Sequence, residues 1–438
     1  MTNAATELQQ RINVAVGDLD CWLDTMRGWR GYTGPIADWW QHRFTSMGSL
    51  LDWRYEGIIA GYLQLWRRTG NGRWLAKAQW AGDDLLAGQS PTGYFAHGAS
   101  GGGPTTVSGS HVAACATALL ELALALRESR SPVWQPYAAA ADLTIHGPIL
   151  GTLWDAERKV FRESPTAATF IPHQVASICE VLFRQAELKH VAAVADEYAL
   201  PALQAIMARQ IRAVGDPLDG AIPYRVVGTQ PSSQFLPLCV ARVVPALLQA
   251  YAWTGTTLFL EAAWRAFAFV QRCGNDDGSF PAVVYPGGRA NQYPHWIAAT
   301  GDVLHAAAAL RAHGISTNVD ATREWLLAGQ DQSGGIATAR GYGARVQQHL
   351  KALPDVRDLL HIVGWCDKAL RGLAGEATDA LPHQERVGHE RNCTYRGRIL
   401  TLAQSEELIE IRRGREVRYR WRKGDDWPTI CAPEFILP

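Results

Sequence analysis

The sequence predicts an all-α fold, an (α/α)6 toroid of six helical hairpins, with a small β-containing appendage at the C-terminus. Loops marked by glycine or an aromatic residue recur at a spacing of roughly 57 to 67 residues. Each loop follows an amphipathic helical segment and precedes a segment that is apolar nearly all round. Because every hairpin needs a neighbour to cover its apolar face, six such units are expected to close into a ring.

Six loops carry the repeat, and each joins an outer helix to an inner helix. Their landmarks are Gly31, Gly93, Val160, Gly220, Gly278 and Gly335. The outer, half-polar helices are expected at 6–29, 74–88, 135–153, 191–214, 257–273 and 319–329. The inner, buried helices are expected to start near Asp52, His111, His173, Phe235, His295 and His361. These loops are long and the returning turns are short, which indicates a functional rim on the long-loop side.

The C-terminal part of the chain departs from the repeat. We expect the toroid to span residues 1–374 and an extension with short strands to span 375–438. Alternating apolar and polar residues at 398–402, 408–411 and 417–421 predict strands. The Arg and Lys residues of this extension are expected to form a solvated strand face and not a binding patch.

Charge and composition exclude several kinds of partner. The 438 residues contain 42 basic and 42 acidic side chains, so no net field attracts nucleic acid or an anionic membrane. The N-terminal segment lacks a basic region followed by an apolar core, and no run of about eighteen apolar residues occurs, so we expect a cytoplasmic location without a membrane partner. The eight Cys are scattered without CxxC pairs, which argues against a disulfide framework and a zinc ribbon.

Three junctions share a glutamine, a glycine turn and a packed hydrophobic residue. They contain Gln89 with Gly93, Gln271 with Gly278, and Gln330 with Gly335. The glutamine can satisfy orphan carbonyls at a helix end, and the glycine can adopt the turn. This pattern resembles the Gln/Trp-type repeat of terpenoid cyclases and the junctions of the six-hairpin glycosidase and polysaccharide lyase superfamily. The resemblance implies a toroid fold more strongly than it implies a reaction.

One polar residue recurs where each inner helix is expected to begin. The set is Asp52, His111, His173, Gln234, His295 and His361. In a closed toroid these positions are expected to converge on the central axis at the long-loop rim. Two interpretations remain open: the side chains cap the inner helices, or neutral imidazoles at helix N-termini act as general bases or bind a ligand.

Cysteines that follow four of these positions raise the question of a metal. Cys115, Cys179, Cys239 and Cys366 lie in the expected inner helices. The segment 364–366 resembles lanthionine cyclases, which are zinc-containing toroids, but their Cys-His pair is missing here. Small buried thiols that pack between helices explain the pattern better, so we expect neither a metal nor another cofactor.

Rim loops rich in aromatic, arginine and amide side chains favour a carbohydrate ligand. Aromatic rings stack on the apolar faces of sugars, and planar donors bind hydroxyl and carboxylate groups. The expected substrate-binding residues are Trp40, Trp53, Tyr94, His97, Arg225, Gln234, Tyr285, Arg289, Asn291, Trp296, Arg340, Tyr342 and His361. The recurrence of Arg suggests an acidic sugar, and the sequence does not predict an oligomeric state.

Two reactions remain close. Hydrolysis calls for two carboxyl groups, for which we select Asp52 and Glu180 from the acidic residues near the rim. β-Elimination calls for a base and a group that neutralises a uronate, for which Tyr293 and His295 are the central pair, with His111 and His173 as further candidate bases. We place glycoside hydrolysis of oligosaccharides, possibly containing uronate, ahead of elimination. A glycan-binding toroid without catalysis is a third hypothesis, and a terpenoid cyclase is the least favoured.

Overall fold

The computed structural model describes residues 3–38, 43–47, 51–95, 109–342, 353–382 and 388–435. Two residues expected at the ligand site, Trp40 and His97, lie outside this part of the chain.

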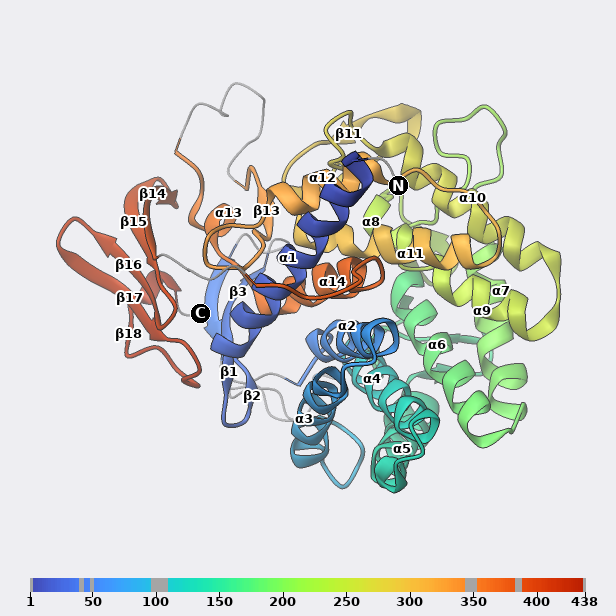
Figure 1. Ribbon diagram of the computed structural model, residues 1–438. Helices are drawn as coiled ribbons and strands as arrows, with labels where there is room; N and C mark the ends of the chain where they lie inside the picture. The colour runs from blue at the N-terminus through green and yellow to red at the C-terminus, as the bar shows by residue number, and fades with distance from the viewer. Residues whose placement is uncertain are drawn as a thin grey trace.

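Six inner helical segments form a closed ring, as Figure 1 shows. Each packs on the next, and the last packs on the first. They are α2 (Arg54–Thr69), α4 (Gly109–Glu128), α6 (Pro172–Lys189), α8 (Pro237–Ala241) with α9 (Val244–Thr254), α11 (Gly301–Ala312) and α14 (Val363–Ala374).

Six outer helices cover this ring, so the predicted (α/α)6 toroid is confirmed. They are α1 (Asn3–Thr25), α3 (Gly72–Gly88), α5 (Gln135–Thr144) continued by η2 (Ile145–Leu153), η3 (Ala195–Ala199) continued by α7 (Leu200–Met207), α10 (Thr257–Cys273) and α12 (Asp320–Ala328). The fourth outer helix ends at Met207 and not near Val214 as expected, because residues after it form a series of turns.

The glutamines of the repeated junctions bind the neighbouring hairpin. Gln89 Nε2 donates to the carbonyl of Ala140 in α5 at 2.7 Å, and Gln330 Nε2 donates to the carbonyl of Ala15 in α1 at 2.9 Å. Gln210, which the sequence analysis did not group with them, makes the same contact to Ala262 in α10. Each glutamine therefore joins consecutive outer helices, and the last one closes the ring onto α1.

The junction glycines allow the same close approach. Gly278 has φ of 83°, and a Cβ there would lie 2.0 Å from the carbonyl oxygen of Ala321 in α12. Gly334 has φ of 87°, and its Cβ would lie 2.3 Å from the carbonyl oxygen of Asp18 in α1. Only glycine tolerates both the positive φ and the contact, which explains the period seen in the sequence.

Short strands occupy the loops of the long-loop rim. They are β1 (Arg27–Gly28), β2 (Gly31–Tyr32), β3 (Gly34–Asp38), β4 (Arg43–Met47), β5 (Trp154–Asp155), β6 (Val160–Phe161), β7 (Thr169–Phe170), β8 (Val226–Val227), β9 (Gln230–Pro231), β10 (Val283–Val284), β11 (Ala290–Asn291), β12 (His295–Trp296) and β13 (Ala339–Arg340). Short helical turns are η1 (Pro132–Trp134), η4 (Pro286–Gly288), η5 (Ala298–Thr300), α13 (Val356–Leu359) and η7 (Pro433–Phe435).

The C-terminal strands form one antiparallel five-stranded sheet beside the toroid (Figure 1). Its strands follow chain order: β14 (His389–Tyr395), β15 (Arg398–Gln404), β16 (Leu408–Arg413), β17 (Glu416–Arg422) and β18 (Ile430–Cys431). Alternate apolar residues such as Leu402 and Ile411 are buried, while Glu410 pairs with Arg412 and Arg420. This ladder of ion pairs agrees with the expected solvated strand face.

Helix α4 is long and apolar enough to cross a membrane by length and composition alone, which the sequence analysis did not anticipate. Most of it is buried inside the toroid, where it packs between α2 and α6. Burial in the inner ring accounts for its composition, as in the core helix of a globular protein.

Candidate active site

A cluster of buried charges lies where five of the six inner segments meet. Its members are Glu56 of α2, Glu180 of α6, Arg242 between α8 and α9, Asp302 of α11, and Asp367 and Arg371 of α14. Buried charges are costly unless they are paired, so such a cluster in an otherwise apolar ring calls for an explanation.

Two arginines hold the cluster together. Arg371 donates to Oε1 of Glu56 at 2.6 Å and to Oδ1 of Asp302 at 2.5 Å. Arg242 contacts the same Oε1 of Glu56 and donates to the Ser177 hydroxyl at 3.2 Å. Its Nη1 lies 4.0 Å from Oε2 of Glu180. Ion pairs therefore connect helices from opposite parts of the chain across the centre of the ring.

Half-buried polar side chains surround this cluster. His173 and Glu180 lie seven residues apart on α6, and His305 follows Asp302 by one turn on α11. Lys368 of α14 is also half-buried. Burial acts to raise the pKa of both Glu56 and Asp302, but the arginines outweigh it and lower both values, and the charge of Lys368 adds to their effect. We therefore regard the buried ions as the floor of the candidate site and these three residues as part of its wall.

Glu56 and Glu180 share Arg242 but differ in their protonation. Burial raises the pKa of Glu180 to about 7, because Arg242 compensates only in part and Glu56 adds repulsion. Burial also acts to raise the pKa of Glu56, but Arg242 and Arg371 outweigh it and hold the value below its usual range. Glu180 can therefore donate a proton near neutral pH, while Glu56 stays ionised.

Several buried polar atoms of the cluster have no hydrogen-bond partner among the described residues. They are Oε1 of Glu180, Oδ1 of Asp367, Nη1 of Arg242 and Nε of Arg371. Burial raises the pKa of Asp367 to about 7 as well. Unsatisfied polar atoms are rare in protein interiors and call for a specific explanation. A ligand rich in hydroxyl groups would satisfy both the donors and the acceptors.

The two imidazoles of the wall are neutral at pH 7. Burial lowers the pKa of His173 to about 4, and the charge of Arg242 lowers it further. Burial lowers the pKa of His305 to about 3, with Arg371 and Arg242 acting in the same direction. Neutral imidazoles can accept a proton from a bound molecule.

Aromatic side chains form a continuous group on the long-loop side of the charges. The ring centroids of Trp53 and His111 lie 4.9 Å apart, those of Trp53 and Trp365 lie 6.4 Å apart, and those of Trp365 and Trp296 lie 4.7 Å apart. Tyr342 continues the group at 6.1 Å from Trp296. Lys368 Nζ lies 5.4 Å from the Trp365 ring and so joins this aromatic group to the charged floor.

Asp52 does not belong to this constellation. It is fully buried, and Oδ1 accepts from Nε of Arg54 at 2.8 Å, while Oδ2 lies 3.3 Å from Nη2. The Arg54 guanidinium also donates to the carbonyl of Tyr32. This geometry gives Asp52 a structural function at the start of α2 and offers no support for it as a catalytic carboxylate.

The four histidines of the repeated polar set do not share one site. His111 contacts Trp53, and His173 stacks near Tyr224 at 5.8 Å between centroids. His361 instead lies against Trp22 of the outer helix α1, with Nε2 at 3.0 Å from Oδ2 of Asp331. His361 is therefore turned into the layer between inner and outer helices.

His295 also faces an outer helix. Its helix α11 begins only at Gly301, so His295 lies in strand β12 and pairs with Arg340 of β13. The imidazole stacks on Tyr293 at 4.7 Å and lies 6.1 Å from Trp325 of α12. Burial lowers the pKa of His295, and Arg340 acts in the same direction while Asp277 opposes it. Tyr293 and His295 thus lie together, but among groups other than the central charges.

The remaining expected ligand residues lie elsewhere on the rim. Tyr94 is half-buried against Thr152 of η2, with 3.3 Å between the two hydroxyl oxygens. Gln234 is also half-buried, and its backbone carbonyl accepts a hydrogen bond from the backbone N–H of Tyr224. Tyr285 packs on Leu236 and Val283. The exposed members are Arg225, Arg289, Asn291 and Arg340.

Five residues of the site were not predicted from the sequence: Arg242, Asp367 and Arg371 of the floor, and His305 and Lys368 of the wall. A signal for some of them was present, since Asp367 and Arg371 are one helical turn apart in a segment whose other residues, apart from Lys368, are apolar.

The thiols of the inner ring face backbone carbonyls. Cys115, Cys179 and Cys366 lie 3.6, 3.5 and 3.3 Å from the carbonyls of Asp52, Ala199 and Ile336. Within the described residues, no group of three or more His, Cys, Asp or Glu side chains is arranged to hold a metal ion.

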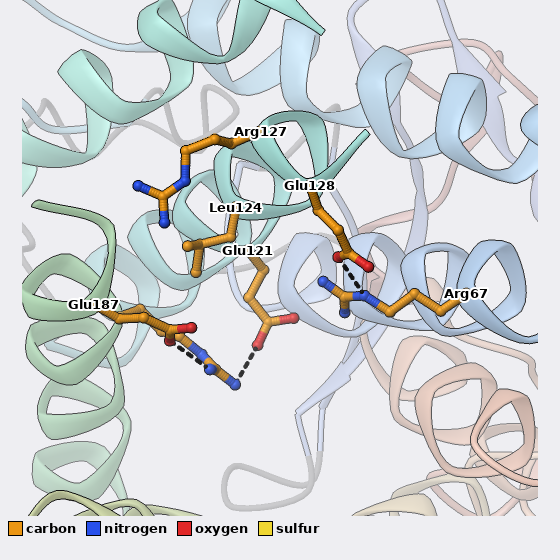
Figure 2. Close-up of a pocket in the computed structure, with 7 residues that line it drawn as sticks. Arg67, Glu121, Leu124, Arg127, Glu128 and Glu187 are labelled. Atoms are coloured by element: carbon orange, nitrogen blue, oxygen red, sulfur yellow. Dashed lines mark hydrogen bonds and ion pairs between the residues drawn. The ribbon is translucent and has the colours of Figure 1, made fainter. Parts of the chain in front are cut away.

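A separate pocket lies at the other end of α2, α4 and α6, as Figure 2 shows. Its volume is about 330 Å³, and ion pairs line it: Arg67 with Glu128 at 3.1 Å, and Arg184 with Glu121 at 3.5 Å and Glu187 at 3.1 Å. Arg184 lies one turn beyond Glu180 on α6. The first two pairs join different helices and the third lies within α6. Because ion pairs occupy this end of the inner helices, we take the aromatic side as the entrance.

Comparisons with known proteins identify the fold. No protein-family model and no curated protein sequence matches the chain. Among solved structures, D-mannose isomerase matches with a TM-score of 0.60 at 13% identity, covering 85% of this chain and 97% of its own. An unsaturated glucuronyl hydrolase specific for heparin matches with a TM-score of 0.59 at 10% identity, covering 84% and 96%.

An inactive variant of the α-1,6-mannanase GH76A of Salegentibacter sp. HEL1_6, in complex with α-1,6-mannotetrose, has a TM-score of 0.55 at 11% identity and covers 84% and 99%. At these identities the likeness establishes the fold, and it confirms the predicted resemblance to six-hairpin glycosidases at that level.

Proposed function

We propose that this chain is a glycoside hydrolase that binds an oligosaccharide at the axial site, with Glu180 as the general acid. The observation that carries the proposal is the pair Glu180 and Glu56, which share Arg242 and have pKa values shifted in opposite directions. Two titratable groups separated in this way are the usual arrangement for acid and base functions in one site.

The proposed reaction uses the two protonation states separately. Glu180, protonated near neutrality, donates its proton to the glycosidic oxygen as the bond to the anomeric carbon breaks. Positive charge then develops on the sugar ring, and the ionised carboxylates of Glu56 and Asp302 stabilise it. Water adds to the anomeric carbon and loses a proton, for which Asp302 and the neutral His173 are the candidate acceptors.

The surroundings of the charges suit a sugar. Trp53 and Trp365, both half-buried, offer flat apolar faces, while the buried Trp296 packs against Trp365. The unpartnered atoms of the floor offer both donors and acceptors for hydroxyl groups. Two structural neighbours are a hydrolase of unsaturated glucuronyl groups and a mannanase. Lys368 beside Trp365 would favour a sugar that carries a carboxylate. We also propose a cytoplasmic location.

A second candidate is the isomerisation of a free sugar. Two neutral imidazoles, His173 and His305, belong to the same wall, and one can take a proton from a carbon while another group returns it. D-mannose isomerase is among the structural neighbours. Elimination has less support, because Tyr293 and His295 lie beside Trp325 and not beside the charged floor.

One assay series separates these reactions. The protein is incubated with uronate-containing oligosaccharides, mannooligosaccharides and free aldoses. Hydrolysis releases reducing ends, and if the substrate carries an unsaturated uronate its absorbance falls, whereas elimination raises that absorbance. Isomerisation converts an aldose to a ketose without new reducing ends. We expect hydrolysis, and a product profile of either other kind would replace it.

The matched variants are Glu180→Gln and Glu187→Gln on the same helix. Glu187 lies near the rim of the opposite pocket with a half-exposed side chain. Loss of a general acid costs about 10²- to 10⁴-fold in rate, so Glu180→Gln is expected to lose activity to that extent while Glu187→Gln keeps it. Full activity of folded Glu180→Gln would remove Glu180 from the mechanism.

A further inference from the structure

Three tryptophans are exposed at the first outer-to-inner junction and its neighbours. Trp29 at the turn between β1 and β2 is 78% exposed, Trp80 on α3 is 55% exposed, and Trp427 after β17 is 47% exposed. Large exposed aromatic side chains that gather in one region mark an interaction site more often than isolated ones do. We call these three residues the tryptophan platform.

Arginines connect the members of the platform. Arg27 Nη2 donates to the backbone carbonyl of Trp80 at 3.1 Å and to Oδ1 of Asp84 at 2.8 Å. Arg30 lies over the Trp29 ring at 4.2 Å from its centroid, and its Nε is 4.0 Å from Asp426, the neighbour of Trp427. These contacts thus bring the three segments that carry the tryptophans into one surface region.

The chemistry of the platform suits a sugar chain better than a protein. The exposed large hydrophobic residues of its segments are all tryptophans, whereas the described exposed Leu, Ile and Val residues belong to other segments. Arg27 and Arg30 are both balanced by carboxylates, so the region carries flat apolar faces and planar donors without strong net charge. Stacking faces interleaved with planar polar groups are what carbohydrate recognition needs.

The position of the platform relates it to the axial site. Strands β1 and β2 lie between α1 and α2 in the chain, and Trp53 directly precedes the first residue of α2. Trp29 of the platform and Trp53 of the aromatic entrance therefore belong to the same junction, the one between α1 and α2.

We propose that the tryptophan platform is a second carbohydrate-binding site, which holds a polysaccharide outside the axial site. Trp29 provides the principal stacking surface, since Arg30 covers one face of its ring and leaves the side chain largely exposed. Trp80 and Trp427 extend the surface. The inference deepens the proposed function, because it makes a long glycan the substrate class, but binding at the platform does not depend on catalysis.

Affinity gel electrophoresis tests this site with soluble polysaccharides of stated composition: mannan, a neutral β-glucan and polygalacturonate. We expect retention of the wild-type protein by at least one of them. Trp29→Ala combined with Trp80→Ala is expected to lower the affinity about tenfold, the loss typical of a principal aromatic contact. The matched control is Trp264→Ala, since Trp264 is 40% exposed on α10, on the opposite side of the molecule in Figure 1. Circular dichroism verifies that each variant folds.

Several results would overturn the proposal: no retention on any of the three polysaccharides, equal retention of the double variant, or an equal loss with Trp264→Ala. A dimer that dissociates on substitution of Trp29 and Trp80, seen by sedimentation, would make the platform an interface between copies of this chain instead. Failure of the proposed function is distinguishable, because Glu180→Gln is expected to lose hydrolysis while keeping retention, and the platform variant is expected to keep activity on short oligosaccharides.

Discussion

Arg371 donates a hydrogen bond of 2.6 Å to Glu56, although 315 residues separate them in sequence. The bond joins α14 to α2, so a buried ion pair links the last hairpin to the first. Removing one partner of a buried pair leaves an uncompensated charge and costs about 3–5 kcal/mol. We therefore expect Glu56→Gln to lower the free energy of unfolding by about 3 kcal/mol, measured by urea titration.

The control for this variant also joins the two ends of the ring. Arg11 of α1 and Glu324 of α12 form an ion pair at 2.7 Å with both side chains about half exposed. Exposed pairs contribute about 0–1 kcal/mol, so Glu324→Gln is expected to change the stability by less than about 1 kcal/mol. Equal effects of the two substitutions would contradict the central importance of the buried cluster.

The activity of the proposed hydrolase is expected to fall above neutral pH. Glu180 donates its proton only while protonated, and its pKa is about 7 because of burial. Above that value kcat/KM should fall about tenfold for each pH unit. Because Glu56 contributes to the raised pKa, Glu56→Gln should shift this alkaline limb to lower pH, which a pH–rate profile measures. An unchanged limb in that variant would assign the titration to another group.

The same group makes stability depend on pH. The folded state keeps the Glu180 proton up to about pH 7, whereas the unfolded chain loses it near the ordinary value of 4.5. Stability from this group is therefore fully present below pH 4.5 and is lost as the pH rises to 7. Glu180→Gln has no carboxyl group to ionise, so it does not suffer this loss. The melting temperature of the variant minus that of the wild type should therefore be larger at pH 8 than at pH 4.5. Thermal unfolding at both pH values tests it, and a constant difference would contradict the raised pKa.

Glycine substitutions test the repeated junction directly. Gly278 and Gly287 both have positive φ, 83° and 76°, but a Cβ at Gly278 would meet the Ala321 carbonyl oxygen at 2.0 Å, whereas a Cβ at Gly287 meets nothing within 4 Å. Gly287→Ala should cost about 1 kcal/mol for the backbone conformation alone. Gly278→Ala should cost clearly more, because α12 must also shift. Urea unfolding of both variants checks this, and equal losses would show that contact between outer helices is unimportant.

Much of the fold was predictable because several of the junctions need the same few residues. A glycine with positive φ and a glutamine that reaches the next outer helix recur at a regular spacing, as Gln330 and Gly334 illustrate. A local requirement of this kind leaves a periodic trace in the sequence. The alternation of the buried Leu400 and Leu402 with more exposed neighbours predicted strands for a similar reason.

The candidate site was less predictable because its contacts are remote in sequence. Arg242 meets Glu56 across 186 residues, and no local pattern distinguishes an axial arginine from one at the surface. The repeated histidines misled for a related reason. Helix α11 begins several residues after His295, whereas α6 begins just before His173, so equal places in the repeat direct their side chains to different layers.

Asp52 provides the sharpest test between the sequence hypothesis and the geometry. Its carboxylate binds Arg54 at 2.8 Å, and both side chains are almost completely buried. Asp52→Asn would leave the guanidinium buried without its counter-ion, so we expect a loss of about 3 kcal/mol in unfolding free energy but an unchanged kcat for the protein that remains folded. Urea titration and an active-site titration of the folded fraction measure the two effects separately. A variant with wild-type stability but without hydrolysis would restore Asp52 as a catalytic carboxylate and displace the cluster around Glu180.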